Sequence, residues 1–429
     1  MTGARGIDDH PLRYALANEF HARPFAALRA PCHAAILAIK APQDAAGRDP
    51  DADRAHLIAL LDRYGATHPA PGATHWHGRI GRLDLRWERH TEFSTYALFG
   101  EGAPEPAFAG AAFEALPAAW LAGAPGVRMA SALARIEPDP GPEGTEARLG
   151  AWFVAESLAA SRVLGGAATV ASDFRIDAGG HVRFAVLAAE GCGGQRLGRI
   201  VQRLFEIEVY RAMSMLGLAR ARSLGPDLKR LDGALGSVME EMVGGLASPE
   251  ASLRALLQGS AEIEAAAARS SYRFGATRAY ERIVAQRIEV LREQRLADHQ
   301  TLGEFMARRY DPAMRTVDSV ALRLATMSGR AGRAADLLRT RVDVARSAQA
   351  QDLLESMDRR ADLQLRLQRT VEGLSVVAIS YYAVGLMLYV LAPLAEAAGA
   401  SRAVAAAVAT PVVVLAVWWM VRRLRRALE

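Results

Sequence analysis

Two long uncharged segments near the C-terminus constrain this chain more than any other feature. The first extends from Leu374 to Leu394 and the second from Ala403 to Val421. A helix needs about 20 apolar residues to cross the hydrocarbon core of a bilayer, so each segment is long enough to span it. The sequence therefore predicts a two-helix transmembrane hairpin over residues 373–422. The alternative is a helix pair buried in a soluble core, which leaves the aromatic and basic residues after the second segment unexplained.

Arginine residues flank the two segments and predict their orientation. Four precede the hairpin and four follow it: Arg359, Arg360, Arg366 and Arg369, then Arg422, Arg423, Arg425 and Arg426. The connecting loop carries only Arg402 and Glu396 as charged residues. Cytoplasmic flanks of membrane spans are enriched in Lys and Arg. We therefore expect a multi-pass protein of the cytoplasmic (inner) membrane with its N- and C-termini both in the cytoplasm.

The end of the second segment has the composition of a membrane-surface anchor. Trp418 and Trp419 come directly before the last arginine cluster. Tryptophan rings favour the membrane interface, and juxtamembrane arginines attract anionic lipid headgroups. The lipid bilayer is thus the first expected partner, and residues 423–429 form a basic cytoplasmic tail.

Composition excludes several other classes of protein. The formal net charge is +5, but basic and acidic residues are interleaved through most of the chain, so no nucleic-acid partner is expected. Cys32 and Cys192 are the only cysteines and lie far apart, which argues against a disulfide framework or a cysteine zinc site. The first residues lack the apolar core of a signal peptide. No cofactor is predicted.

Residues 1–190 predict a cytoplasmic α/β domain of short strands and loops. Leu83, Leu85 and Trp87 alternate with polar residues, which is the period of a half-buried strand, and Phe93–Phe99 follows closely enough to form a hairpin with it. We also expect strands at His33–Ile39, Val127–Ile136, Ala151–Val154, Ala168–Ile176 and His181–Leu187, a helix at Ala52–Tyr64, and loops at Glu101–Gly110 and Glu137–Ala147. The predicted fold class is α+β, with a mixed or antiparallel sheet.

Residues 191–372 predict a helical domain that ends in a coiled-coil stalk. Helices are expected from about Gln195, and then at Pro226–Met242, Ser248–Ala268, Thr277–Arg309 and Pro312–Met327. Asp311 before Pro312 is typical of a helix start, and Ser328–Gly332 is a further expected break. No proline lies between that break and the first span. We therefore expect the long stalk helix and the first span to be continuous.

Six polar residues near the N-terminus form the densest candidate site: His10, Arg13, Glu19, His21, Arg23 and His33. Glu19, His21 and a distant histidine would suit a metal site or an acid–base pair, provided that the segment is extended. Alternatively, Glu19 and Arg23, four residues apart, pair on a helix or turn before Pro24 while the histidines cap loops. The spacing favours the second interpretation and leaves the metal unknown.

Two further motifs carry weaker signals. His75 and His77 share one face of a strand, but no carboxylate stands at a matching spacing, so a solvated strand face is favoured over a metal site. The glycines from Gly191 to Gly194 precede a helix, but Arg196 stands where a dinucleotide-binding pattern requires glycine. A tight turn that opens the helix is favoured there. With no catalytic motif found, the chain is not predicted to be an enzyme.

The first predicted span carries a polar face. Ser375, Tyr382 and Tyr389 recur every seven residues and so share one face, with Gly385 close by, whereas Thr410 is the one polar residue within the second span. One interpretation is a pore lined by the first span of each subunit. The other, which is favoured, is a packing seam where small and hydroxyl residues let helices approach. Both predict a homo-oligomer that associates through the first span.

Two stretches resemble a known family. The segments HPLRYALANEFHARP (His10–Pro24) and RTVEGLSVVAISYYAVGL (Arg369–Leu386) are similar to signatures of an uncharacterised bacterial family of predicted membrane-anchored proteins, domain of unknown function 3422. The resemblance extends over the whole chain and includes the C-terminal hairpin. It implies a membrane anchor and carries over no functional residue.

The architecture also resembles, more loosely, that of CorA-type magnesium transporters. A cytoplasmic α/β domain, a long stalk helix that enters the first span, a short outer loop, a second span and a basic tail are shared with that family. The resemblance implies a pentamer with a pore lined by the first span. The family's Gly-Met-Asn signature is absent, because Tyr389–Pro393 stands in its place. The resemblance is one of fold and says little about function.

Three functional hypotheses follow from these patterns. The first is an ion-conducting homo-oligomer of CorA-like build, motivated by the polar face of the first span. The second is a membrane-tethered scaffold or regulatory protein with a cytoplasmic protein partner and no transport activity. The third, ranked last, is a metal-dependent enzyme that uses Glu19, His21 and His33.

Overall fold

A computed structural model describes residues 9–19, 25–42, 48–244, 248–397 and 401–428 of the 429-residue chain. Contacts divide the chain into two compact units. The first contains Met1–Leu246 and Arg254–Ala334, and the second contains Ala247–Leu253 and Ala335–Glu429. The sheet-to-helix change expected near residue 190 lies within the first unit, because the helix that follows it packs on the sheet.

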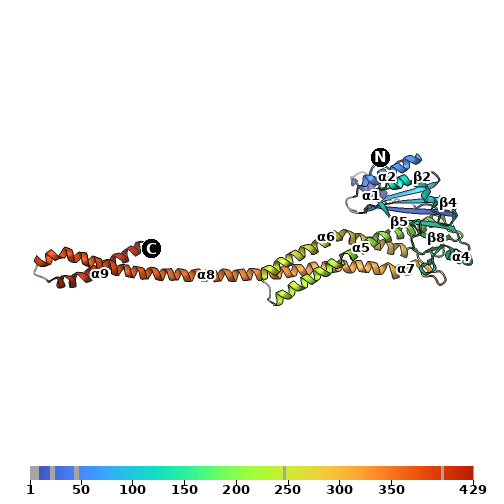
Figure 1. Cartoon of the computed structure of the whole chain (residues 1–429). Helices are drawn as coiled ribbons and strands as arrows, with labels where there is room; N and C mark the ends of the chain where they lie inside the picture. Colours follow the sequence, from blue (N-terminus) through green and yellow to red (C-terminus); the bar gives the residue numbers. More distant parts are fainter. Residues whose placement is uncertain (1–8, 20–24, 43–47, 245–247, 398–400, 429) are drawn as a thin grey trace. The chain divides into compact units, whose positions relative to one another are not determined.

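A mixed sheet of nine described strands organises the first unit (Figure 1). In order across the sheet, the strands are β2 (His75–Ile80), β3 (Leu83–Arg89), β4 (Phe93–Glu101), β1 (Cys32–Lys40), β5 (Val127–Pro138), β8 (Val182–Ala188), β7 (Ala168–Ser172), β6 (Ala159–Val163) and β9 (Gln294–Arg295). Strands β5 and β8 pair in parallel, and the other neighbours are antiparallel. The predicted α+β class and the β3–β4 hairpin are confirmed.

The helices of the described residues are α1 (Arg13–Glu19), α2 (Pro50–Tyr64), η1 (Ala111–Ala115), α3 (Ala118–Ala122), α4 (Pro142–Trp152), η2 (Ala155–Ser157), α5 (Gly194–Gly244), α6 (Pro249–Glu289), α7 (Leu302–Arg309), α8 (Asp311–Ala397) and α9 (Arg402–Leu428). The two faces of the sheet pack against different helices. Along β1, Ile36 and Ala38 face a core that includes residues of α5, whereas Leu37 and Ile39 face a core that includes residues of α2 and α3. Burial on both faces explains why β1 is apolar from Ala34 to Ile39.

Two predicted elements of the sheet domain are wrong. Ala151–Val154 was expected to be a strand, but helix α4 ends there at Trp152, and its N-terminal part occupies the loop expected at Glu137–Ala147. Pro142 stands at the start of α4, a position where the missing N–H of proline removes no helical hydrogen bond. The prolines and glycines at the start of this helix therefore led to the incorrect prediction of a loop.

The helix boundaries predicted between residues 195 and 309 are also partly wrong. Helix α5 continues through Pro226 instead of ending before it, and buried Leu224 and Leu228 lie on either side of the proline. Conversely, the helix expected over Thr277–Arg309 is interrupted by β9. The restart at α7 is a capping box, in which the Thr301 side chain accepts the N–H of Glu304 and Glu304 accepts the N–H of Thr301.

Helix α8 confirms the predicted continuity of stalk and first span. It contains 87 residues, begins at Asp311 beside the expected Asp-Pro start, and passes through Ser328–Gly332 without the expected break. Alanine, leucine and arginine, which favour helix, surround the two glycines and outweigh their propensity. Residues 398–401 alone separate α8 from α9, so the second unit ends in a helical hairpin.

Candidate functional site

Two helices in the described part of the chain are long and apolar enough to cross a membrane. Apolar windows within Leu302–Leu394 and Ala403–Arg423 have mean hydropathies of 2.0 and 2.2. Only 6% of the first window and 17% of the second is buried. Core helices of soluble proteins are mostly buried, so the exposure of these windows favours a lipid environment.

The two apolar helices pack through one face of α8. On α9, Ala409, Val413 and Val417 are buried at four-residue spacing, and on α8 Ser380 is buried at 7% exposure. Residues at this spacing lie on one side of a helix, so these side chains form the seam between α8 and α9. The Ser380 hydroxyl lies within this seam and has no hydrogen-bond partner among the described residues.

The predicted polar face of the first span points away from this seam. Tyr382 is two residues beyond Ser380, about 200° around the helix, and its side chain is 71% exposed. Tyr389 lies on the same side and is 84% exposed. Ser375 is also exposed, and its hydroxyl donates to the carbonyl of Val371 at 2.8 Å. The seam within the hairpin therefore uses other residues, and the tyrosine face is left without a partner in the described chain.

The tyrosine face combines large and small side chains. The Tyr382 ring meets that of Tyr381 edge to face at 5.8 Å, and the half-buried Gly385 lies one turn beyond Tyr382. Among the described residues, neither the Tyr382 nor the Tyr389 hydroxyl has a hydrogen-bond partner. Transfer of a hydroxyl without a partner from water to alkane is unfavourable by about 4–8 kcal/mol, so in a bilayer such a face would be stabilised by water or by a second chain.

The predicted anchor forms two cation–π pairs at the end of α9. The guanidinium of Arg422 lies 5.0 Å from the ring centroid of Trp418, and that of Arg423 lies 5.2 Å from the ring of Trp419. Arg425 and Arg426 belong to α9, but their side chains lie outside the described ones. An amphipathic aromatic ring beneath a cation suits the boundary between hydrocarbon and headgroups.

The N-terminal polar cluster is only partly described. His10 is exposed and accepts the backbone N–H of Leu12, and Arg13 forms an ion pair with Asp9. His33 on β1 lies 2.9 Å from the carbonyl of Gly102 through its Nδ1. Glu19 ends α1 with its side chain outside the description, as are His21 and Arg23. Among the described residues no three His, Cys, Asp or Glu side chains converge on a metal position, and the enzyme hypothesis stays a prediction.

The glycine turn before α5 is built for close packing. A Cβ at Gly194 would lie 2.9 Å from the carbonyl oxygen of Leu28, and a Cβ at Gly198 would lie 1.7 Å from that of Ala26. The N–H of Leu28 also donates to the carbonyl of Gly194 at 3.1 Å. These contacts agree with the predicted tight turn. His77 is exposed on β2, in agreement with a solvated strand face.

A half-buried polar network that sequence patterns missed joins the sheet to α5. Arg86 on β3 pairs with Glu88 and donates to Gln202 Oε1 at 2.6 Å, and Gln202 donates to Glu206 at 2.8 Å. His90 also lines the adjoining cavity of about 50 Å³, which has room for a few water molecules only. Arg86 and Gln202 lie 116 positions apart in sequence, so no local pattern indicates their contact. The cavity is too small to admit a substrate. The hydrogen bond between Arg86 and Gln202 holds α5 against the sheet.

Comparison with known proteins gives one match. The family described as protein of unknown function (DUF3422) matches residues 8–428. No curated protein and no solved structure gives a significant match, and none of the comparisons supports a likeness to CorA-type transporters. Because the match covers nearly all of the chain, including the N-terminal signature, the sheet, the stalk and both apolar helices, this protein belongs to the DUF3422 family.

Proposed function

We propose that this protein is a homo-oligomer of the cytoplasmic membrane whose first spans surround an ion-conducting path. The observation that carries the proposal is the orientation of Tyr382 and Tyr389, which lie opposite the α9 seam and are exposed. In a ring of copies, α9 meets lipid through its apolar surface while the tyrosine face of α8 meets neighbouring first spans and water. Such a ring removes polar hydroxyls from hydrocarbon.

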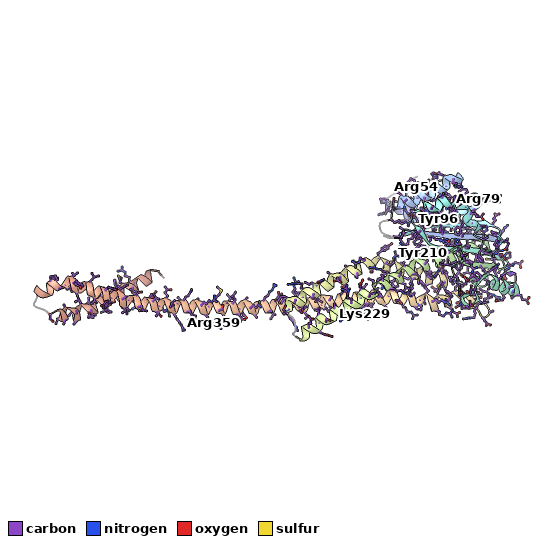
Figure 2. All side chains as sticks on the ribbon, in the orientation of Figure 1. Arg54, Arg79, Tyr96, Tyr210, Lys229 and Arg359 are labelled. Atoms are coloured by element: carbon purple, nitrogen blue, oxygen red, sulfur yellow. The ribbon has the colours of Figure 1, made fainter. Side chains whose placement is uncertain are left out.

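The stalk supports the same assembly. From Ala350 to Leu374 the apolar side chains recur with a seven-residue period, and all of the large ones are exposed. Eight charged residues occupy the second, third and sixth places of that period: Asp352, Glu355, Asp358, Arg359, Asp362, Arg366, Arg369 and Glu372. Arg360 is the one charged residue elsewhere in the period. Figure 2 shows side chains around Arg359 projecting from α8 into open space.

The stalk period continues into the span without a change of face. When places are counted from Ala350, Gly385 falls at the first place, and Tyr382 and Tyr389 fall at the fifth. The same two places hold mostly apolar residues in the stalk. Ser380 falls at the third place, with the charges. One side of α8 therefore pairs with α9 inside the membrane and meets water outside it, while the other side carries most of the large apolar stalk residues and Arg360 as its one charged residue. Four apolar places in seven suit a bundle of more than two helices better than a two-stranded coil.

Ion flux into liposomes tests the conducting path. We expect the purified full-length protein to pass K⁺, Mg²⁺ or Cl⁻, and the double substitution Ser375→Leu and Tyr382→Leu to abolish that flux. Thr410→Leu is the matched control, because Thr410 is exposed on α9, the helix that meets lipid in the proposed ring, and its hydroxyl donates to the carbonyl of Ala406 within the same helix. An inactive wild-type protein, or equal flux in wild type and double variant, would exclude conduction.

One observation favours a second candidate, a membrane-tethered scaffold or regulatory protein. The Ser375 hydroxyl bonds to its own helix, so the tyrosine face offers isolated phenols in place of a continuous polar lining, as in a packing seam. The exposed stalk would then hold copies together or bind a cytoplasmic protein. Native mass spectrometry of the protein in lipid nanodiscs separates the candidates, since a dimer supplies too few first spans for a central path.

A further inference from the structure

A second cavity lies on the face of the sheet that carries α2 and α3. It has a volume of about 340 Å³, at the lower end of the roughly 300–1,000 Å³ typical of small-molecule sites. Its apolar wall comes from Leu37 and Ile39 of β1, Phe113 of η1 and Leu121 of α3. It lies wholly within the first unit and shares no residue with the network around Arg86.

The polar wall of this cavity is formed by Ser131, His181 and Arg128. Ser131 Oγ donates to the carbonyl of Ile36 at 3.0 Å and lies 2.8 Å from His181 Nδ1. Because the hydroxyl hydrogen is used on Ile36, we assign the hydrogen of the second contact to His181 Nδ1, which leaves Nε2 as an acceptor in the neutral ring. Burial lowers the pKa of His181, and the neighbouring Arg128 lowers it further, against the opposing charge of Asp177.

Arg128 makes the cavity attractive to an anion. Its Nη1 donates to the carbonyl of Gly179 at 3.0 Å, which uses one of the five N–H donors of the guanidinium. Among the described residues that line the cavity, Arg128 alone carries a fixed charge. The nearby Asp177 carboxylate accepts the backbone N–H of His181 at 2.9 Å and is not part of the lining.

Two glycines hold the polar wall in place. A Cβ at Gly179 would lie 2.9 Å from Cδ2 of His181, and a Cβ at Gly180 would lie 2.1 Å from Nη2 of Arg128. Gly180 also has a φ of +85°, which favours glycine. Any side chain at either position would displace Arg128 or His181. The turn thus leaves space for both side chains against the cavity, while the Phe113 ring stacks on His181 at 4.8 Å between centroids.

We propose that this cavity binds a small monocarboxylate with an aromatic or short aliphatic body. The carboxylate would pair with the Arg128 guanidinium, and the apolar body would lie against Leu37, Phe113 and Leu121. A charge-assisted pair at one end and an apolar wall at the other are the two features that such a ligand requires. The site is independent of the membrane hairpin, so it holds whether or not the protein conducts ions.

Calorimetric titration of the full-length protein in nanodiscs with benzoate tests the proposal, with benzamide as the neutral analogue of the same shape. We expect benzoate to bind at least about tenfold more tightly than benzamide, because only benzoate forms the charged pair. Arg128→Gln should remove that preference, whereas Arg79→Gln, an exposed arginine on β2, should leave it unchanged. Leu121→Trp should weaken both ligands by filling the cavity.

Three results would overturn the proposal. They are no binding of benzoate to the wild-type protein, equal affinities for benzoate and benzamide, and an unchanged preference in the Arg128→Gln variant. Circular dichroism of each variant separates loss of the site from loss of the fold. Since Arg128 is on the surface end of β5 and exposed, Arg128→Gln should unfold at the same temperature as the wild type.

Discussion

Glu92 has no exposed surface, and several groups stabilise its charge. Arg273 donates to both of its carboxylate oxygens, Tyr280 donates to Oε1 at 2.8 Å, and Lys40 Nζ lies 3.8 Å away. Burial alone would raise the pKa of Glu92, but the Arg273 pair and the Tyr280 hydrogen bond outweigh burial, and the pKa is lowered. Removal of one member of such a cluster leaves the others buried without compensation.

We therefore expect Glu92→Gln to destabilise the first unit by about 3–5 kcal/mol. Thermal unfolding of the full-length protein, followed by circular dichroism, should show a lower midpoint. The matched control is Glu262→Gln, which breaks the exposed ion pair with Arg230 and should leave the midpoint close to that of the wild type, because exposed ion pairs contribute little to stability. Equal midpoints for the two variants would show that the buried cluster contributes no more than a surface pair.

His56 makes the stability of the same unit depend on pH. Its Nε2 donates to the carbonyl of Trp120 at 3.0 Å, which leaves Nδ1 to accept from the Tyr96 hydroxyl at 2.9 Å. Burial lowers the pKa of His56 from its ordinary value of 6.5, against the raising effects of Trp120 and Asp53. The neutral ring is thus favoured in the folded state, so its contribution to stability is present above pH 6.5 and is lost as the pH falls.

The measurement is the unfolding midpoint between about pH 8 and pH 5, a range in which an unperturbed histidine titrates. We expect the wild-type midpoint to fall on acidification and His56→Gln to be less stable at high pH but flatter across the range. His77→Gln, at an exposed position on β2, should follow the wild type. A His56→Gln profile parallel to that of the wild type would contradict the linkage.

At the scale of elements, the spacing of apolar residues predicted the long helices and strand β3, but it did not predict where individual helices end. The apolar runs of α8 and α9, and the alternation in β3, follow from patterns that extend over many residues. The break between α6 and α7 depends on the Thr301–Glu304 capping box and on Glu293, whose carboxylate accepts the N–H groups of Leu302 and Gly303. A helix end of this kind depends on a few side chains, whereas the surrounding sequence keeps the apolar spacing of a helix.

Tertiary contacts account for the remaining differences. Pro226 was expected to start a helix, but α5 continues through it because the leucines around it are buried in the helical layer. The tyrosine face of the first span was predicted from spacing alone. Its position opposite the α9 seam depends on how two helices pack, which spacing does not specify. The site around Arg128 likewise brings together strands and loops that are distant in sequence.

The stalk provides a direct test of self-association at this scale. Leu367 falls at the fourth place of the seven-residue period, on the apolar side, whereas Leu365 falls at the second place among the charges. Both side chains are exposed in the single chain, at 67% and 52%. If copies pack through the apolar side, Leu367→Glu should bury a charge and reduce the subunit count, because an unpaired charge in a helix interface is unfavourable.

Leu365→Glu is the control for that experiment, since it introduces the same charge two residues away. Its subunit count in native mass spectra of nanodiscs should equal that of the wild type. A wild-type monomer, or identical effects of the two substitutions, would remove the stalk from the assembly. Because the single-chain exposures of the two leucines are similar, a difference between them reports on contacts between chains.

At the scale of the whole molecule, the arginine distribution predicts the topology of the hairpin, which flux measurements do not test. If both ends of the chain lie in the cytoplasm, the loop between α8 and α9 must lie outside. Ser401 in that loop and Ser347 in the stalk are both exposed in the described chain, so each accepts a cysteine without disturbing a core. The native Cys32 is buried and Cys192 is half-buried, so the chain without a new cysteine is labelled in parallel as the blank.

We expect a membrane-impermeant maleimide to label Ser401→Cys in intact spheroplasts and to label Ser347→Cys only after the membrane is permeabilised. The two positions exchange their behaviour if the hairpin is inverted, and both stay unlabelled until permeabilisation if it does not cross. Either of those patterns contradicts the proposed topology. The expected pattern would place the sheet domain and its carboxylate site in the cytoplasm, since the chain from β1 to the stalk contains no other apolar segment of spanning length among the described residues.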